Sequence, residues 1–329
     1  MTDNPSDNPS DNPSDNPPDN QGAEILALVN RGGIVESRHF GHFVELDREG
    51  KIKFSRGNVN ELIFPRSSIK AVQSSAMVRA GLKLEPRLLA LVSASHSGSQ
   101  THINAVLEIL ALAGLAESAL QNAKDRPLGE EERRQWGGGL PTSLAQNCSG
   151  KHAGMLLTCV INDWSTSEYL LPTHPLQLKI REELEVLSGE SISLTSVDGC
   201  GAPLFLISLL GLARAIQKLT ISNHPAHLEV MNACRGYPEM VAGEGRSTTR
   251  IMRETPGLFL KEGAEGVGVG SLLDGRTFAF KISDGAARAY SPLVYAALRH
   301  FGARGRTNDE DSSPIYGGSA VVGSISTSF

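Results

Sequence analysis

Residues 33–46 read Gly-Ile-Val-Glu-Ser-Arg-His-Phe-Gly-His-Phe-Val-Glu-Leu, and this stretch decides the fold class. Its β-branched and aromatic residues lie between two turn signals, Gly32-Gly33 and Glu49-Gly50, as expected for a strand that starts and ends in turns. Similar stretches at 23–29 and 51–54 flank it. The three stretches together predict an antiparallel meander, so we expect the folded chain to begin with a sheet.

The middle of the chain has a helical period. Apolar positions about 3.6 residues apart predict helices over 66–81, 102–116, 150–163, 175–188, 203–218, 225–235 and 245–254. Short β-like runs return between residues 258 and 283, before an apolar helix over 287–301. The most economical packing joins the strands of both ends in one sheet covered by helices. We therefore predict an α+β fold.

Both ends of the chain have a biased composition. Residues 3–20 repeat an Asp-Asn-Pro-Ser unit, which has too little apolar surface to offset the entropy lost on ordering. We expect residues 1–22 to be a disordered tail. Residues 304–329 form a low-complexity segment rich in Gly, Ser and Thr, with enough β-branched residues for one edge strand. This leaves residues 23–303 as a single domain.

Charge and hydropathy exclude several classes of function. The net charge is −5, and because residues 1–22 hold five aspartates, the rest of the chain balances 31 basic against 36 − 5 = 31 acidic residues. A balanced chain offers no basic patch for nucleic acid or an anionic membrane. The acidic, proline-rich N-terminus is unlike a secretory signal. These features predict a cytoplasmic protein with a small-molecule substrate and no nucleic-acid or membrane partner.

The sharpest chemical signal is Pro65-Arg66-Ser67-Ser68-Ile69-Lys70. Side chains three residues apart lie on one face of a helix, so Ser67 and Lys70 can meet. A lysine can activate a serine only if burial and nearby positive charge lower its pKa from about 10.4 toward neutrality. The alternative is an ordinary surface turn of a helix. Because the Ser-Asp-Asn and Lys-Thr-Gly motifs are absent, a straightforward β-lactamase is disfavoured.

Three further clusters carry reactive side chains. Residues 93–98, Ser-Ala-Ser-His-Ser-Gly, suit either an exposed elbow for a nucleophile or the cap of the next helix. Cys148 and Cys200 lie 52 residues apart and suit either buried free thiols or zinc ligands. Lys261 stands beside a glycine-rich turn, where a solvated lysine is the simpler interpretation. The residues alone leave these alternatives open.

Taken together, these motifs resemble the rhizobial-type L-asparaginases, the thermolabile, inducible asparaginase II family. The resemblance extends from about Arg31 to Arg288, and seven motifs in the right order are more specific than any one of them. The motifs are residues 31–37, 64–70, 94–98, 147–155, 198–201, 241–243 and 261–267.

The resemblance implies a fold similar to the serine β-lactamases and glutaminases, with residues 23–303 as the catalytic domain. It implies hydrolysis of L-asparagine to aspartate and ammonia by two Ser-Lys pairs, Ser67 with Lys70 and Ser95 with Lys261. We expect Ser67 to be the nucleophile and Lys70 its base, although the two serines can exchange roles. A homodimer is also implied.

The resemblance further implies a zinc site and a set of substrate-binding residues. The implied zinc ligands are Cys148, Lys151 and Cys200, and the implied substrate-binding residues are Asp198, Arg66 and His96. One alternative is a glutaminase or another Ser-Lys amidohydrolase. A second is a catalytically inactive zinc-binding regulatory protein on the same scaffold.

The chain departs from the family pattern at several places, including a short segment between Gly81 and Leu88 and Ser99 where an acidic residue is common. Residues 121–126, Gln-Asn-Ala-Lys-Asp-Arg, stand where a Cys-Gly-x-His stretch is expected, and Thr248 stands where the family tends to have Asp. The implied serines, lysines and zinc ligands are all present. We therefore expect an altered substrate preference or affinity rather than a loss of activity.

Overall fold

The structure, a computed structural model, describes residues 22–303 and 312–329. The predicted disordered tail, residues 1–22, lies outside the described residues except for Gly22, and residues 304–311 also lie outside them.

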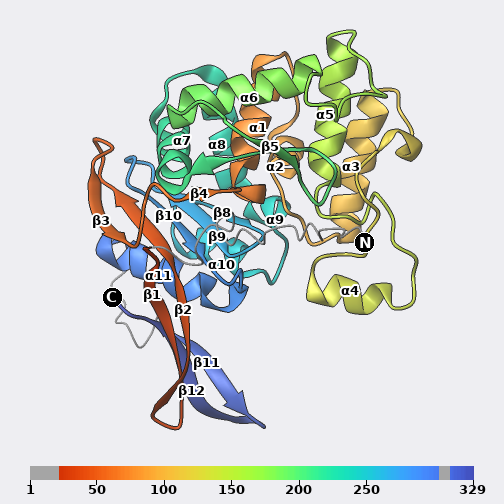
Figure 1. Ribbon diagram of the computed structural model, residues 1–329. Helices are drawn as coiled ribbons and strands as arrows, with labels where there is room; N and C mark the ends of the chain where they lie inside the picture. The colour runs from red at the N-terminus through yellow and green to blue at the C-terminus, as the bar shows by residue number, and fades with distance from the viewer. Residues whose placement is uncertain (1–21, 304–311) are drawn as a thin grey trace, which may run out of the picture.

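An antiparallel sheet forms the base of the fold, and its strands come from both ends of the chain (Figure 1). The described strands of this sheet are β1 (Glu24–Arg31), β2 (Ile34–Leu46), β3 (Ile52–Arg56), β8 (Phe259–Gly263), β9 (Val267–Ser271), β10 (Thr277–Ile282), β11 (Ser313–Gly317) and β12 (Ala320–Thr327). Their order is β11-β12-β1-β2-β10-β9-β8, with β3 also paired to β2. The pairing of β2 with β10, which sets Phe43 opposite Phe280, joins the two ends of the chain. The predicted α+β architecture is confirmed.

The C-terminal segment differs from the expectation of one edge strand. It forms a hairpin of two strands, and β12 pairs along β1, with Ala27 opposite Thr327. Of these two C-terminal strands, β11 lies at an edge of the sheet and β12 lies inside it. The small, polar composition concealed this pairing, because a β ladder is held by backbone hydrogen bonds that any residue except proline can supply.

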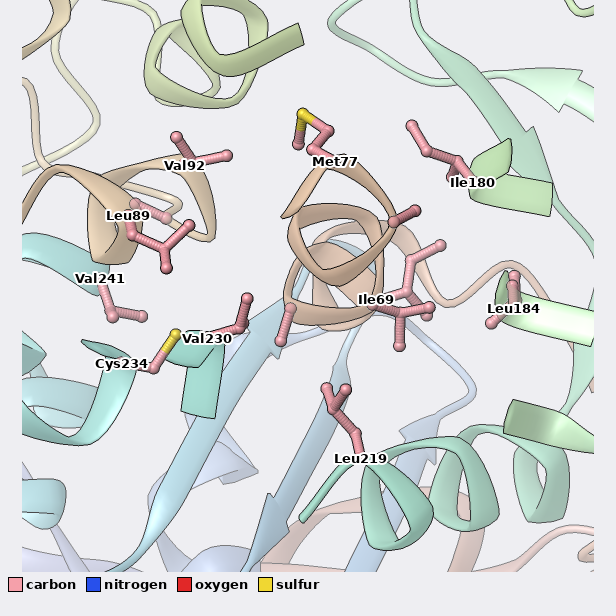
Figure 2. Packing of buried hydrophobic residues seen from close by; sticks show 14 of the residues in the cluster. Ile69, Met77, Leu89, Val92, Ile180, Leu184, Leu219, Val230, Cys234 and Val241 are labelled. Atoms are coloured by element: carbon pink, nitrogen blue, oxygen red, sulfur yellow. The ribbon is translucent and has the colours of Figure 1, made fainter. Parts of the chain in front are cut away.

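A layer of helices covers one face of the sheet, and α1 lies at its centre. In Figure 2, Met77 marks this helix and Ile69 the 3-10 turn directly before it, with side chains from α2, α6, α7 and α8 around them. The helices of the fold are α1 (Lys70–Arg79), α2 (Pro86–Val92), α3 (Gln100–Leu112), α4 (Glu130–Trp136), α5 (Ser149–Ile161), α6 (Pro175–Ser188), α7 (Leu209–Ile221), α8 (Pro225–Gly236), α9 (Pro238–Val241), α10 (Ser247–Glu254) and α11 (Tyr290–His300). The remaining short elements are η1 (Arg66–Ile69), η2 (Glu117–Ala119), η3 (Ala287–Ala289), β4 (Leu62–Ile63), β5 (Thr195–Val197), β6 (Pro203–Phe205) and β7 (Ile207–Ser208). None of the helices in the described ranges is both long and apolar enough to cross a bilayer.

One predicted helix begins later than its apolar period suggested. Residues 203–208 form the short strands β6 and β7, and α7 starts only at Leu209. The side chain of Ser208 accepts a hydrogen bond from the amide of Gly211, 2.8 Å away, as an N-cap does. The cap therefore sets the start of α7 within an apolar run that continues on both sides.

The alternation of side chains along the C-terminal strands separates two cores. Phe280 of β10 packs in the cluster that contains Leu293 of α11, whereas the neighbouring Ala279 belongs to the cluster under the helical layer. Val269 of β9 also belongs to that second cluster, and Lys261 of β8 lies directly opposite Val269 in the register. Because paired residues point to the same face of a sheet, Lys261 is buried beneath the helices instead of being solvated.

Replacing Gly268 by alanine tests this two-core arrangement. A Cβ at Gly268 would overlap the ring of Phe280, which lies in the packed core below the sheet. We expect Gly268→Ala to lower the free energy of unfolding by about 1–3 kcal/mol, measured by urea denaturation. Gly138→Ala is the matched control, because a Cβ there would meet nothing within 4 Å. Equal stability of the two variants would contradict this packing.

Candidate active site

The candidate site lies between β8 and the helical layer, where three polar segments converge. They are the start of α1, the segment 93–99 that follows α2, and the start of α5. Backbone hydrogen bonds hold the middle segment in place, from the amide of Ser95 to the carbonyl of Val241 (3.0 Å) and from the amide of His96 to the carbonyl of Asn147 (3.1 Å). Ser95 is therefore presented from a fixed backbone.

Ser95 is the meeting point of two lysines. Its Oγ accepts hydrogen bonds from Nζ of Lys70 (3.2 Å) and from Nζ of Lys261 (2.9 Å). Ser95 is 3% exposed, and each lysine is 1% exposed. Two amines from distant parts of the sequence thus share one hydroxyl out of contact with bulk water.

Each lysine also donates to other polar groups, which fix its position. Nζ of Lys70 also donates to the carbonyl of Ala94 and to Sγ of Cys148, which is 3.0 Å away. Nζ of Lys261 also donates to the carbonyl of Glu262 at 2.8 Å. Burial, together with the charge of Lys70, lowers the pKa of Lys261 to about 7. Near neutral pH a substantial fraction of Lys261 is therefore uncharged.

Ser67 lies in η1, just before α1, and is less buried than Ser95. The hydrogen bonds that Nζ of Lys70 makes among the described residues go to Ala94, Ser95 and Cys148, and not to Ser67. The structure therefore places Ser95, rather than Ser67, in direct contact with both lysines.

Arg66, immediately before Ser67, has a left-handed backbone with φ of 53°. This region is costly for a residue with a side chain. An ion pair holds the residue there, because Nε of Arg66 donates to Oδ1 of Asp198 at 2.7 Å. Burial raises the pKa of Asp198, but the charges of Lys151 and Arg66 outweigh it and lower the pKa overall. Arg66 and Asp198 thus form a charged pair beside Ser67.

Cys148, Cys200 and Lys151 form a second polar cluster beside Lys70. A hydrogen bond from Cys148 and the charge of Lys151 lower the pKa of Cys200 to about 5, and the same bond raises the pKa of Cys148. Nζ of Lys151 donates to Sγ of Cys200 at 3.2 Å. Burial lowers the pKa of Lys151, but the negative charges of Cys200, Cys148 and Asp198 together outweigh burial and raise the pKa overall. The surroundings therefore favour a thiolate at Cys200 and an ammonium group at Lys151.

Metal ligands of the common types do not form a cluster within the described ranges. No group of three or more His, Cys, Asp and Glu side chains there has a geometry that could hold a metal ion. The predicted zinc ligands Cys148, Lys151 and Cys200 are a different donor set, because only the two cysteines belong to these four residue types. A zinc site at Cys148, Lys151 and Cys200 therefore stays a prediction.

His96 is fully buried and uses both ring nitrogens within the protein. Its Nδ1 accepts from the amide of Gly98 at 3.1 Å, so Nε2 carries the hydrogen and donates to Oγ of Ser149 at 2.9 Å. Burial and the positive charges around it hold the pKa of His96 well below its usual range. The neutral ring connects the Ser95 segment to the start of α5.

Two further residues, His152 and Tyr169, interact electrostatically with the cluster of Cys148, Lys151 and Cys200. Nδ1 of His152 lies 2.8 Å from the hydroxyl of Tyr169, which accepts a hydrogen bond from the amide of Gln121 at 3.1 Å. Gln121 lies in the segment that departs from the family motif. Its backbone amide makes this contact, so most other residues at this position could make it too. No local pattern marks Tyr169, because its partners lie 17 and 48 residues away.

A close helix contact brings the start of α5 to the site. A Cβ at Gly150 would lie 2.6 Å from the carbonyl oxygen of Leu91 in α2, so only glycine permits this approach. The glycines of the Asn147–Met155 motif therefore place Cys148 and Lys151 beside Lys70.

Comparison with known proteins shows a family and weaker structural likenesses. The sequence matches the model of the family described as L-asparaginase II over residues 27–326. No curated protein matches it. Among solved structures, Mglu in its native form is similar at a TM-score of 0.44 and 14% identity, over 79% of this chain and 62% of that chain. A β-lactamase from Mycobacterium bovis is similar at a TM-score of 0.36 and 12% identity, over 79% of this chain and 94% of that chain.

The family match covers nearly all of the residues that the structure describes, including every element of the candidate site. The chain therefore belongs to the L-asparaginase II family of amidohydrolases.

Proposed function

We propose that this protein hydrolyses the side-chain amide of L-asparagine to aspartate and ammonia through a serine ester. The observation that carries the proposal is the position of Ser95 Oγ between Nζ of Lys70 and Nζ of Lys261. A buried hydroxyl between two amines, one of which has a pKa of about 7, can pass a proton in either direction. Membership of the family supports the choice of an amide as substrate.

In this proposal Ser67 is the nucleophile, because a substrate can reach it more easily than Ser95. The strained backbone of Arg66 supports this role, since such strain concentrates at functional positions. Lys70 lies one helical turn away and can approach Ser67 when substrate binds, even though the free enzyme directs Nζ elsewhere.

The hydrolysis has two stages, in which Ser67 first forms an ester with the substrate and then loses it to water. Oγ of Ser67 attacks the amide carbon and its proton passes to Lys70. Ser95 and Lys261 relay a proton to the leaving nitrogen, the C–N bond breaks, and ammonia departs. Water then attacks the ester: its hydroxyl completes the carboxyl group of aspartate, and its proton passes through Ser95 to Lys261. Lys70 returns its proton to Oγ of Ser67, so each group regains its starting state.

We also propose that Cys148, Lys151 and Cys200 bind zinc. Their donor atoms are already gathered, and Cys200 is predisposed to ionise, which suits a soft thiolate ligand. Binding would require Lys151 and Cys148 to lose their protons, so it should release protons to the buffer. A bound zinc ion would supply positive charge beside Lys70, which contacts Cys148.

The other residues have supporting roles in this proposal. The pair Arg66 and Asp198 borders Ser67 and is available to bind substrate. His96, expected to bind substrate, fits a positioning role better, because both of its nitrogens are engaged within the protein. The homodimer and the cytoplasmic location remain predictions from sequence.

Substitution of the two serines tests the mechanism. We expect Ser67→Ala and Ser95→Ala each to lower kcat/KM for L-asparagine by roughly 10³-fold or more, because they act as one unit, measured by ammonia release. Ser165→Ala, at an exposed site, is the control. Undiminished turnover by Ser67→Ala would show that Ser67 is not the nucleophile. Faster ammonia release from L-glutamine than from L-asparagine would favour a glutaminase.

The low pKa of Lys261 has a measurable effect on stability. The unfolded lysine is protonated up to pH of about 10.4, whereas the folded one loses its proton near pH 7, so the free energy of unfolding should rise between these values. We expect Lys261→Met to be more stable than the wild type by about 2–5 kcal/mol at pH 6, with the difference vanishing near pH 10. Lys83→Met, at an exposed site, should show no such pH dependence. A pH-independent difference would show that Lys261 is charged throughout.

Metal analysis tests the zinc proposal independently of activity. We expect the purified wild type, dialysed against zinc, to retain about one zinc ion per chain, and Cys200→Ser to retain far less. Cys159→Ala is the control, since Cys159 is a buried free thiol outside the cluster. If all three proteins bind the same amount of zinc, the ligand assignment is wrong. An active protein without zinc would leave the serine mechanism intact.

A further inference from the structure

Arg246 and Thr248 hold the same carboxylate, that of Glu262, which follows Lys261 in β8. An ion pair joins Nη2 of Arg246 to Oε1 of Glu262, and Oγ1 of Thr248 donates to Oε2 at 3.3 Å. Arg246 directly precedes α10, and Thr248 lies in the first turn of that helix and is 1% exposed. The three side chains therefore form one polar group next to Lys261.

Arg246 has a donor that this polar group does not use. Its Nη1 is buried and, within the part of the chain that the structure describes, has no hydrogen-bond partner. A guanidinium group presents donors in a fixed fork and can bind carboxylates at more than one nitrogen. Burying such a donor without a partner costs free energy. The neutral side chain of Thr248 therefore leaves Arg246 with one carboxylate where its donors suit two.

The pair of Arg246 and Glu262 acts on Lys261 through both contact and charge. Nζ of Lys261 donates to the backbone carbonyl of Glu262 at 2.8 Å. Burial and the charge of Lys70 lower the pKa of Lys261 to about 7. Among the smaller contributions, Glu262 raises this pKa and Arg246 lowers it. The two members of the pair therefore oppose each other at the amine.

Neighbouring thiols, a histidine and a tyrosine stay uncharged near neutral pH. Hydrogen bonding and burial raise the pKa of Cys148, and burial raises that of Cys234. Burial holds the pKa of His96 well below its usual range and that of Tyr290 well above it. The charges that act on Lys261 are therefore those of its lysine, arginine and glutamate neighbours, and a new carboxylate beside them would add to them directly.

We propose that position 248 sets the upper pH limit of the hydrolysis, and that Thr248 keeps this limit low by binding Glu262 without adding charge to its pair with Arg246. The inference rests on the proposed hydrolysis, in which Lys261 gives a proton to the leaving nitrogen and must therefore begin charged. Thr248 does not touch the reacting atoms and acts through Glu262 and Lys261. The departure from the family pattern at this position thus has a physical consequence.

Direct titration of Lys261 tests the inference without turnover. In protein isotope-labelled at lysine Cε, we expect the magnetic resonance signal of Lys261, assigned by its loss in Lys261→Met, to titrate near pH 7. Thr248→Asp should raise this midpoint by roughly one pH unit, because an added negative charge favours the ammonium form. Thr248→Asn has the shape of the aspartate without its charge and should leave the midpoint unchanged. Asn104→Asp, which adds the same charge at an exposed site, should also leave it unchanged.

Glu262→Gln tests the opposite sign and does not depend on the folding of Thr248→Asp. It removes the carboxylate and keeps the charge of Arg246, so the midpoint of Lys261 should fall by roughly one pH unit. An unchanged midpoint in Glu262→Gln would overturn the inference. So would a midpoint that moves equally in Thr248→Asp and Thr248→Asn, since packing rather than charge would then be responsible.

The pH profile of hydrolysis gives a second readout, which is a gain of activity on the alkaline side. We expect the alkaline limb of kcat/KM for L-asparagine to move up by roughly one pH unit in Thr248→Asp. The ratio of kcat/KM at pH 8 to that at pH 6 should therefore rise about fivefold over the wild type, because more Lys261 stays charged at pH 8. A purely structural defect would lower activity at every pH and leave the limb in place.

The outcomes separate this inference from the proposed hydrolysis. If the wild type releases ammonia from no amide but Lys261 titrates as expected in the variants, the electrostatic role of Thr248 stands and the hydrolysis fails. If L-asparagine is hydrolysed but Thr248→Asp leaves both the midpoint and the alkaline limb in place, the hydrolysis stands and the inference is overturned.

Discussion

The site depends on one constraint, which is that two amines must share a single hydroxyl away from water. Lys70 reaches Ser95 from the central helix of the upper layer, and Lys261 reaches it from a strand of the sheet below. Both amines are buried, so charge is poorly screened there and the charge of Lys70 opposes protonation of Lys261. The helical layer supports this arrangement because it excludes solvent from the face of the sheet on which Lys261 lies.

The thiols extend this arrangement into a connected polar chain. Lys70 contacts Cys148, Cys148 hydrogen bonds with Cys200, and Cys200 pairs with Lys151. A change of charge at the thiols is therefore felt at Lys70, and through Ser95 at Lys261. If zinc occupies the thiols as proposed, this chain couples the metal to the protonation of the amines without requiring the metal to touch the substrate.

Several features around the site reduce local stability and are held by packing elsewhere. Arg66 keeps a left-handed backbone through its ion pair with Asp198, and Lys261 is buried although its charged form prefers water. Among the residues that the structure describes, Arg246 Nη1 and Ser97 Oγ are buried without a hydrogen-bond partner. Groups of this kind are tolerated when the surrounding scaffold fixes them.

The sequence by itself determined the α+β order, most helices of the middle region and the family, because periodicity and short motifs are local properties. Only the tertiary structure decided that Lys70 contacts Ser95 and Cys148, that Lys261 lies beneath the helices, and that β12 pairs with β1. Ser95 and Lys261 are 166 residues apart, and no local propensity specifies such a contact. It follows from strand register and helix packing, which depend on the whole chain closing on itself.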